Sequence, residues 1–221
     1  MSERDWRARL AALDTGIVSD ALDRLQLRGA TIGIRPVWPC GKIVGRATTV
    51  KTMPAGRLVA RHHLGVRAIS EAEPGGVIVI DSGGRTDVSS WGDLLATAAK
   101  QRGLSGVVID GACRDVDGCQ AAGFPVYARA VVPCTARGRI VEASTNEPVQ
   151  CGGVHVFPGD LVIADGSGVV FIPQDRWEEV LAVAEELFAR EQAMFEQLRR
   201  GVPLTEVDRQ ANYEGMLRPQ P

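Results

Sequence analysis

Gly76-Val-Ile-Val-Ile-Asp81 and Gly106-Val-Val-Ile-Asp110 are two short, continuous apolar runs, the pattern of strands that are covered on both faces. Between them, a Gly/Ser-rich segment over 82–90 is expected to form a loop. A helix is predicted from about Trp91 to Arg102, because Gly103 follows it as a stop signal. Strand, helix and strand with short connections form a βαβ unit, whose strands run parallel with a right-handed crossover. The sequence therefore predicts an α/β fold with this unit at its centre.

Apolar spacing before this unit predicts two short N-terminal helices, over about 4–13 and 16–27. Thr15 or Ser19 could cap the second helix, and Gly29 would end it. A β-branched strand and a further helix are expected to follow, over Gly41–Met53 and Arg57–Glu71.

The segments after the central unit are predicted to be strands and one long amphipathic helix, over Gln174–Arg200. The C-terminal tail, 202–221, is expected to be mobile or bound to a partner. No internal repeat is evident, and the chain, 1–221, is expected to form a single domain. The further strands are expected at Val126–Val132, Arg139–Ala143, Val154–Phe157, Asp160–Ala164 and Val169–Ile172.

Composition narrows the class of protein. Of 221 residues, 45% are hydrophobic and 24% charged, and the net charge is −2 without a basic cluster, which argues against nucleic-acid binding. No apolar stretch approaches the roughly 20 residues of a membrane span, and the N-terminus lacks the apolar core of a signal peptide. The five cysteines are odd in number and form no Cys-x-x-Cys pair, which favours reduced thiols in a cytoplasmic protein.

Two segments carry the candidate chemistry, Trp91-Gly92-Asp93-Leu94-Leu95 at the start of the predicted helix and Cys113-Arg114-Asp115 after the second strand. In a βαβ unit the carboxyl ends of both strands open at one edge of the sheet, where α/β proteins bind ligands. We therefore expect the two segments to lie side by side.

The residue types in these segments suit a small anionic oxo acid. The first-turn amides near Leu94 and Leu95 have no partner within the helix, so the helix start attracts a carboxylate or phosphate. Arg114 can hold a carboxylate with two hydrogen bonds. Asp115 offers a hard oxygen ligand suited to Mg²⁺ or Mn²⁺. Asp93, Arg114 and Asp115 are the candidate catalytic residues.

Each candidate also has a plain structural explanation. Asp93 follows Ser90 by three residues and could complete a capping box. Arg114 and Asp115 could form a surface ion pair or a turn, and Gly92 could serve close packing alone. Cys113 could be a thiolate favoured by Arg114, but a small buried residue is the simpler interpretation.

Other motifs are weaker. Arg61-His62-His63 is expected to be solvated or packed rather than metal-binding, because adjacent histidines on a helix point in different directions. His155 alternates with apolar neighbours on a strand. There is no Gly-x-Gly-x-x-Gly, Walker loop or Gly-x-Ser-x-Gly. A Schiff-base aldolase would need a pocket lysine, and the chain has only Lys42, Lys51 and Lys100.

The spacing Asp93-x20-Arg114-Asp115, preceded by Gly92, resembles the signature of the RraA-like class II pyruvate aldolases. These include the 4-hydroxy-4-methyl-2-oxoglutarate and 4-carboxy-4-hydroxy-2-oxoadipate aldolases. The resemblance covers a core of about 10–201, leaving 202–221 as a tail. It extends to three further blocks, Thr15–Asp23, Gly123–Arg129 and Asp160–Pro173.

The resemblance implies a β/β/α swivelling domain that assembles as a homotrimer or homohexamer, with sites between subunits. By the same resemblance, Asp115 would ligate the divalent metal and Arg114 would hold the carboxylate or enolate oxygen of pyruvate. The amides from Gly92 to Leu95, which include Asp93 and Leu94, would complete the carboxylate site. Glu191, on the long C-terminal helix, would reach a neighbour's site, although a solvated glutamate is the ordinary interpretation.

The resemblance implies a metal-dependent lyase, with Mg²⁺ or Mn²⁺ as cofactor. It would cleave a 4-hydroxy-2-oxo di- or tricarboxylic acid to pyruvate and a second oxo acid, with oxaloacetate decarboxylation as a side activity. The alternative is a non-catalytic regulator that binds a ribonuclease, because some members of the family do so. The label of menaquinone methyltransferase, also used for the family, is disfavoured because no glycine-rich nucleoside site is present.

Overall fold

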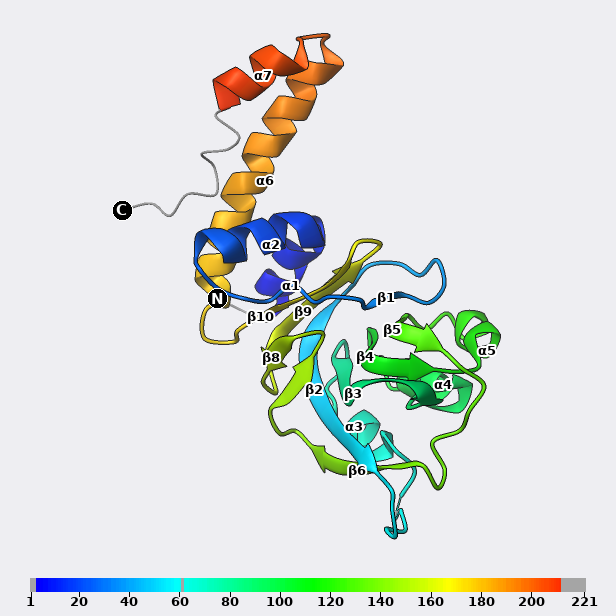
Figure 1. The fold of residues 1–221 in the computed structure, drawn as a ribbon. Coiled ribbons are helices and arrows are strands. Elements are labelled where there is room, and N and C mark those ends of the chain that lie inside the picture. Colours follow the sequence, from blue (N-terminus) through cyan, green and yellow to red (C-terminus); the bar gives the residue numbers. More distant parts are fainter. Residues whose placement is uncertain (1–2, 61, 212–221) are drawn as a thin grey trace.

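The computed structural model describes residues 3–60 and 62–211 (Figure 1). Its helices are α1 (Glu3–Ala12), α2 (Thr15–Arg24), α3 (Val66–Glu71), α4 (Asp93–Gln101), α5 (Val116–Ala121), α6 (Trp177–Arg199) and α7 (Leu204–Ala211). Its strands are β1 (Arg35–Pro36), β2 (Ile43–Pro54), β3 (Val77–Ser89), β4 (Gly106–Cys113), β5 (Val126–Val131), β6 (Ile140–Thr145), β7 (Val149–Cys151), β8 (Val154–Val156), β9 (Leu161–Asp165) and β10 (Gly168–Ile172).

The main sheet places the predicted βαβ unit at its centre. Strands run in the order β1-β5-β4-β3-β2-β9-β10, with β6 paired to β2, and β7 and β8 form a separate hairpin. The pairs β2·β3, β3·β4 and β4·β5 are parallel, whereas β9 and β10 are antiparallel. The predicted unit, now β3–α4–β4, is confirmed, and so is the mixed α/β class with N-terminal helices and a long C-terminal helix.

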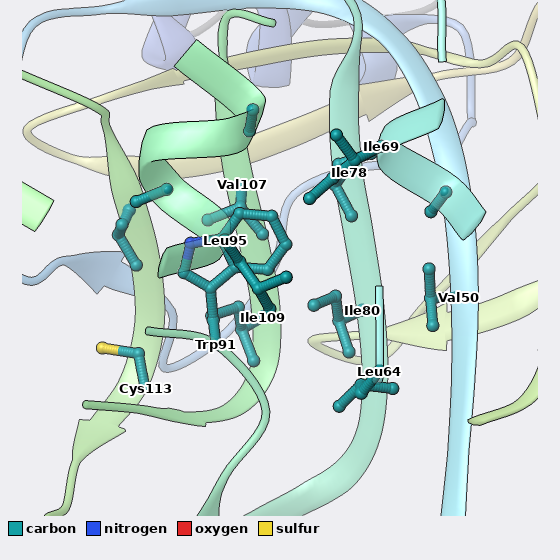
Figure 2. Close-up of a cluster of buried hydrophobic side chains, with 14 of the residues drawn as sticks. Val50, Leu64, Ile69, Ile78, Ile80, Trp91, Leu95, Val107, Ile109 and Cys113 are labelled. Atoms are coloured by element: carbon teal, nitrogen blue, oxygen red, sulfur yellow. The ribbon is translucent and has the colours of Figure 1, made fainter. Parts of the chain in front are cut away.

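The core lies on both faces of this sheet. Helices α3, α4 and α5 contribute to one cluster, in which Trp91 and Leu95 pack near Ile109 (Figure 2). Helices α1, α2 and α6 cover β9 and β10 in a second cluster. All eight residues of β4 are buried, which explains why its sequence is apolar without alternation. No helix among the described residues has the length and apolar character needed to cross a membrane.

The predicted loop over 82–90 is wrong, because β3 continues to Ser89. Its pairing with β4 shifts register between Asp81 and Arg85 and again before Ser89. Gly83 and Gly84 have φ of +62° and +71°, a backbone that glycine adopts without strain. These two glycines allow the strand to change register while it stays paired with β4. The polar, glycine-rich sequence is typical of a loop, so it does not predict this strand.

The predicted helix over Arg57–Glu71 is also wrong in its first half, since Val66–Glu71 is the only helical part among the residues described there. Leu58 and Val59 are exposed, so the start of this segment offers no buried apolar side chains that would stabilise a helix there. The helix begins after Gly65, whose φ is +81°.

Two smaller differences concern caps and the C-terminal tail. Asp14 rather than Thr15 or Ser19 caps α2, accepting a hydrogen bond from the Ile17 amide at 2.9 Å. Part of the tail that was expected to be mobile or bound to a partner forms the helix α7, while 212–221 lie outside the described residues.

Candidate functional site

The structure brings the two predicted segments together at the carboxyl edge of β3 and β4. The Arg114 amide donates to the Trp91 carbonyl at 3.0 Å. Gly92 lies so close to the second segment that a Cβ there would be 2.6 Å from Asp115 Oδ2 and 3.4 Å from Arg114 Cγ. Any larger residue at position 92 would therefore displace the Arg114–Asp115 pair.

Asp93 makes a second close approach, to α5. A Cβ at Gly118 would lie 2.6 Å from the Asp93 Cβ. Asp93 Oδ1 accepts a hydrogen bond from the Leu94 amide at 2.7 Å. The capping box with Ser90 is absent from this part of the described chain, because Gly92 is the N-cap residue without a side-chain cap. Since Asp93 occupies the Leu94 amide, an incoming anion would use the neighbouring first-turn amides instead.

Arg114 and Asp115 form an ion pair, with Nε 3.0 Å from Oδ2, and each side chain is about one third exposed (34% and 35%). Asp115 has φ of +53°, in the left-handed region that aspartate tolerates better than most residues. It stands directly before α5, and its carbonyl accepts from the Cys119 amide at 2.9 Å. The pair is thus held in place and open to solvent.

A concave pocket with an open volume of about 410 Å³ lies over these residues. Its walls include all six site residues predicted from the two segments: Gly92, Asp93, Leu94, Leu95, Arg114 and Asp115. His63, which the sequence analysis expected to be solvated or packed, also lines the pocket. The sequence analysis missed Thr135, Ala136 and Arg137, from the segment after β5. One signal could have found the last three, because β5 is parallel to β4 and ends at the same edge of the sheet.

Glu191 does not line this pocket. It lies on α6, half-buried, where burial and the carboxylates of Asp14 and Asp20 raise its pKa. Its surroundings within the chain are therefore the N-terminal helices, not Arg114 and Asp115.

The structure does not support a cysteine or lysine nucleophile in this pocket. Cys113 is fully buried, and desolvation raises the pKa of its thiol to about 12, so Arg114 does not favour a thiolate. Each of the chain's three lysines is engaged away from the pocket walls: Lys42 with the Leu13 carbonyl, Lys51 with Asp81, and Lys100 with the Gly123 carbonyl.

The described residues contain no cluster of three or more His, Cys, Asp and Glu side chains able to hold a metal ion. His62 is exposed, His155 lies 3.3 Å from the Gln150 side chain, and Arg61 lies outside the described residues. A cation at this pocket would have one carboxylate ligand, Asp115, and would take its others from water and substrate. Mg²⁺ is commonly bound in that way, so the residues present fit such an ion.

Comparison with known proteins gives consistent matches. A family model described as RraA-like (Aldolase/RraA) matches residues 15–171. A provisionally named 4-hydroxy-4-methyl-2-oxoglutarate aldolase of Halalkalibacterium halodurans is 34% identical over 192 residues, 87% of this chain and 88% of that protein. Protein DlpA of Legionella pneumophila is 35% identical over 164 residues, 74% of this chain, but the match spans only 27% of its length.

A solved structure shares the fold. The crystal structure of Streptomyces coelicolor RraAS2, described as an unusual member of the RNase ES inhibitor RraA protein family, superimposes with a TM-score of 0.80. It is 27% identical, and the match covers 90% of this chain and 100% of that one.

Proposed function

The chain belongs to the RraA-like family, and from that premise we propose that it is a divalent-metal-dependent aldolase acting on 4-hydroxy-2-oxo acids. The products would be pyruvate and a second oxo acid. The observation that carries the proposal is the convergence of Arg114, Asp115 and the α4 start in one pocket. We further propose a homo-oligomer, trimer or hexamer, in the cytoplasm, with neither nucleic acid nor membrane as partner.

Substrate binding would place the pyruvate-forming end of the molecule at the start of α4. The first-turn amides and the partial positive charge of the helix end would receive its carboxylate. Arg114 would donate to the 2-oxo oxygen, which becomes the enolate oxygen during the reaction. Gly92, having no side chain, leaves room for this approach.

Retro-aldol cleavage removes the proton of the C4 hydroxyl, breaks the C3–C4 bond and leaves the electron pair on pyruvate enolate. Asp93 is the second carboxylate in the pocket and is our candidate to accept that proton. Return of a proton to C3 completes pyruvate. Loss of CO₂ from oxaloacetate gives the same enolate, so decarboxylation is an expected side activity.

We propose Mg²⁺ or Mn²⁺ as the cofactor, held by Asp115. Such an ion, when bound, supplies Lewis-acid stabilisation of the developing negative charge. Asp115 would hold it, and Arg114, 3.0 Å from the same carboxylate, would keep Asp115 oriented.

A coupled assay with lactate dehydrogenase tests this proposal. It follows pyruvate release from oxaloacetate and from 4-hydroxy-4-methyl-2-oxoglutarate, with Mg²⁺ and with EDTA. Arg114→Ala and Asp115→Asn should each lower kcat/KM by about 100-fold or more, because stabilisation of the enolate charge is lost. Arg85→Ala and Asp87→Asn, which break an exposed ion pair outside the pocket walls, are the matched controls and should retain activity.

The second candidate function is that of a regulator that binds a ribonuclease. It is supported by the shared fold with RraAS2, which is described as an unusual member of the RNase ES inhibitor RraA protein family. Inactivity of the wild-type protein with every substrate, together with tight ribonuclease binding, would support the regulator and contradict the aldolase. Activity that survives EDTA or Arg114→Ala would contradict the mechanism above.

A further inference from the structure

We propose that Arg137 is a specificity-determining residue that binds the second carboxylate of the substrate and so selects dicarboxylic oxo acids. This inference rests on the proposed function. It arises from the segment 132–139, between β5 and β6. This segment supplies a wall of the pocket and follows both predicted segments in the sequence.

The beginning of this segment is tied to the strands that carry the site. The Val132 amide donates to the Cys113 carbonyl at 2.9 Å, directly before Arg114. Ser89, at the end of β3, donates twice to the Cys134 carbonyl, from its amide at 3.1 Å and from its hydroxyl at 2.6 Å. The segment is therefore fixed to the same two strand ends as the catalytic candidates.

The end of the segment is a tight turn. The amides of Arg139 and Ile140 both donate to the Ala136 carbonyl, at 2.9 and 3.0 Å, and the Arg137 amide donates to Thr135 Oγ1 at 3.3 Å. Arg137 lies within this turn with its backbone held from both sides. Its exposed side chain can reach a ligand without any change in the fold.

The two arginines of the pocket differ in their partners. Arg114 is paired with Asp115, whereas the Arg137 guanidinium has no ion pair or hydrogen bond to the described residues. An unpaired guanidinium on a pocket wall is a receptor for a carboxylate, which it can bind through two parallel hydrogen bonds.

Substrate chemistry supplies the matching group. A 4-hydroxy-2-oxoglutarate-type molecule has a carboxylate at each end, and the α4 start with Arg114 accounts for only one of them. Arg137 accounts for the other. A monocarboxylic analogue would lack this contact and would bind with a higher KM, while the groups at the pyruvate-forming end remain unchanged.

The test compares a dicarboxylic substrate, 4-hydroxy-4-methyl-2-oxoglutarate, with a monocarboxylic one, 4-hydroxy-2-oxopentanoate, in the Mg²⁺-loaded protein. Arg137→Gln should raise KM for the dicarboxylate by about tenfold, the loss of one charged contact, and leave kcat and the monocarboxylate nearly unchanged. Arg139→Gln is the matched control. It removes the same charge from the same turn, along with a 3.3 Å contact to the Thr135 carbonyl, and should keep wild-type selectivity.

Equal losses on both substrates in Arg137→Gln, or the same change of selectivity in Arg139→Gln, would overturn the proposal. If the wild-type protein cleaves neither substrate, the proposed function fails. The role of Arg137 in binding is then tested separately, by measuring ligand affinity. Calorimetry with oxaloacetate and with pyruvate should then still show selective loss of oxaloacetate affinity in Arg137→Gln. Unchanged affinity for both would refute the role.

Discussion

Asp115 combines a left-handed backbone with a carboxylate that is about one third exposed, directly before α5. A non-glycine residue at positive φ stores backbone strain, which persists where the surrounding contacts determine it. Here the contacts are the Cys119 amide on one side and the close approach of Gly92 on the other. The Asp115 carboxylate lies beside Gly92, at the start of α4. The contacts that hold the strained backbone of Asp115 therefore also hold its carboxylate in the site.

Gly92→Ala tests this close approach. Its φ of −157° suits alanine, so α4 should form normally, but the new Cβ would lie 2.6 Å from Asp115 Oδ2. We expect kcat/KM for pyruvate release to fall by about 100-fold, the usual cost of misplacing catalytic groups, with little change in Tm. Gly166→Ala, where nothing lies within 4 Å of a new Cβ, is the control. A Gly92→Ala enzyme of normal activity would show that the pair can shift without consequence.

Cys113 gives a prediction for pH. Desolvation raises the pKa of its thiol to about 12 in the folded chain, from an ordinary value near 9.0. Between pH 9 and 12 the thiol ionises in the unfolded chain but stays protonated in the folded one. The folded state therefore keeps its full stability below pH 9 and loses stability as the pH rises towards 12. Cys113→Ala should reduce the slope of unfolding free energy against pH in that window by about 1.4 kcal/mol per pH unit. Urea titrations at a series of pH values between 9 and 12 measure this slope, and an unchanged slope in Cys113→Ala would contradict the prediction.

The secondary-structure elements show which features the sequence could and could not predict. The β3–α4–β4 unit was predictable, because strands buried on both faces give continuous apolar runs. Its geometry also predicted that the segment around Gly92 would lie beside Arg114 and Asp115. The helix α5, of six residues, is too short to show a helical period. The 132–139 wall depends on hydrogen bonds from Ser89 and to Cys113, distant contacts that no local pattern carries.

The hairpin β7–β8 is joined to the main sheet by buried apolar side chains and by two carboxylates, not by strand pairing. Asp110 Oδ2 accepts from the Gly152 amide at 2.8 Å, and Asp110 Oδ1 pairs with Arg129. Asp81 accepts from the Gln150 amide at 3.0 Å and pairs with Lys51. Both carboxylates are nearly fully buried, so each depends on its contacts to the hairpin and to a basic side chain for hydrogen bonds.

Asp110→Ala should therefore destabilise the domain by about 3 kcal/mol, since it leaves Arg129 and the Gly152 amide without their partner. Denaturant unfolding gives the energy, and hydrogen exchange should show the hairpin amides losing protection first. Asp87→Ala, in the exposed pair with Arg85, should not move the unfolding midpoint. Equal effects of the two substitutions would contradict the anchoring role of Asp110.

The overall shape of the chain is a sheet domain with a helical arm. Helix α6 begins against α1 and α2 and then extends away from the sheet, with α7 folded back along it (Figure 1). Buried residues of α6 end at Leu187, and Phe195 further along is 43% exposed. Glu191 lies on this outer half.

If Glu191 serves a neighbouring subunit, two inactive variants should complement one another. Co-expressed Arg114→Ala and Glu191→Gln chains should recover about a quarter of wild-type turnover, because random mixing in a symmetric oligomer gives that share of intact sites. Each variant alone should be nearly inactive. Glu186→Gln, five residues earlier on α6 and paired with Arg24, is the control for altered helix charge. Absence of recovery in mixed oligomers would assign Glu191 to its own chain.

The hydrophobic cluster between α1, α2 and α6 packs residues that are far apart in the sequence, from Trp6 to Leu187. During synthesis at the ribosome, the apolar face of the first two helices emerges long before its partner helix has been translated. At ordinary elongation rates the interval is on the order of ten seconds. A nascent chain of this protein must therefore expose that face throughout, which makes it a natural client for a chaperone that binds early.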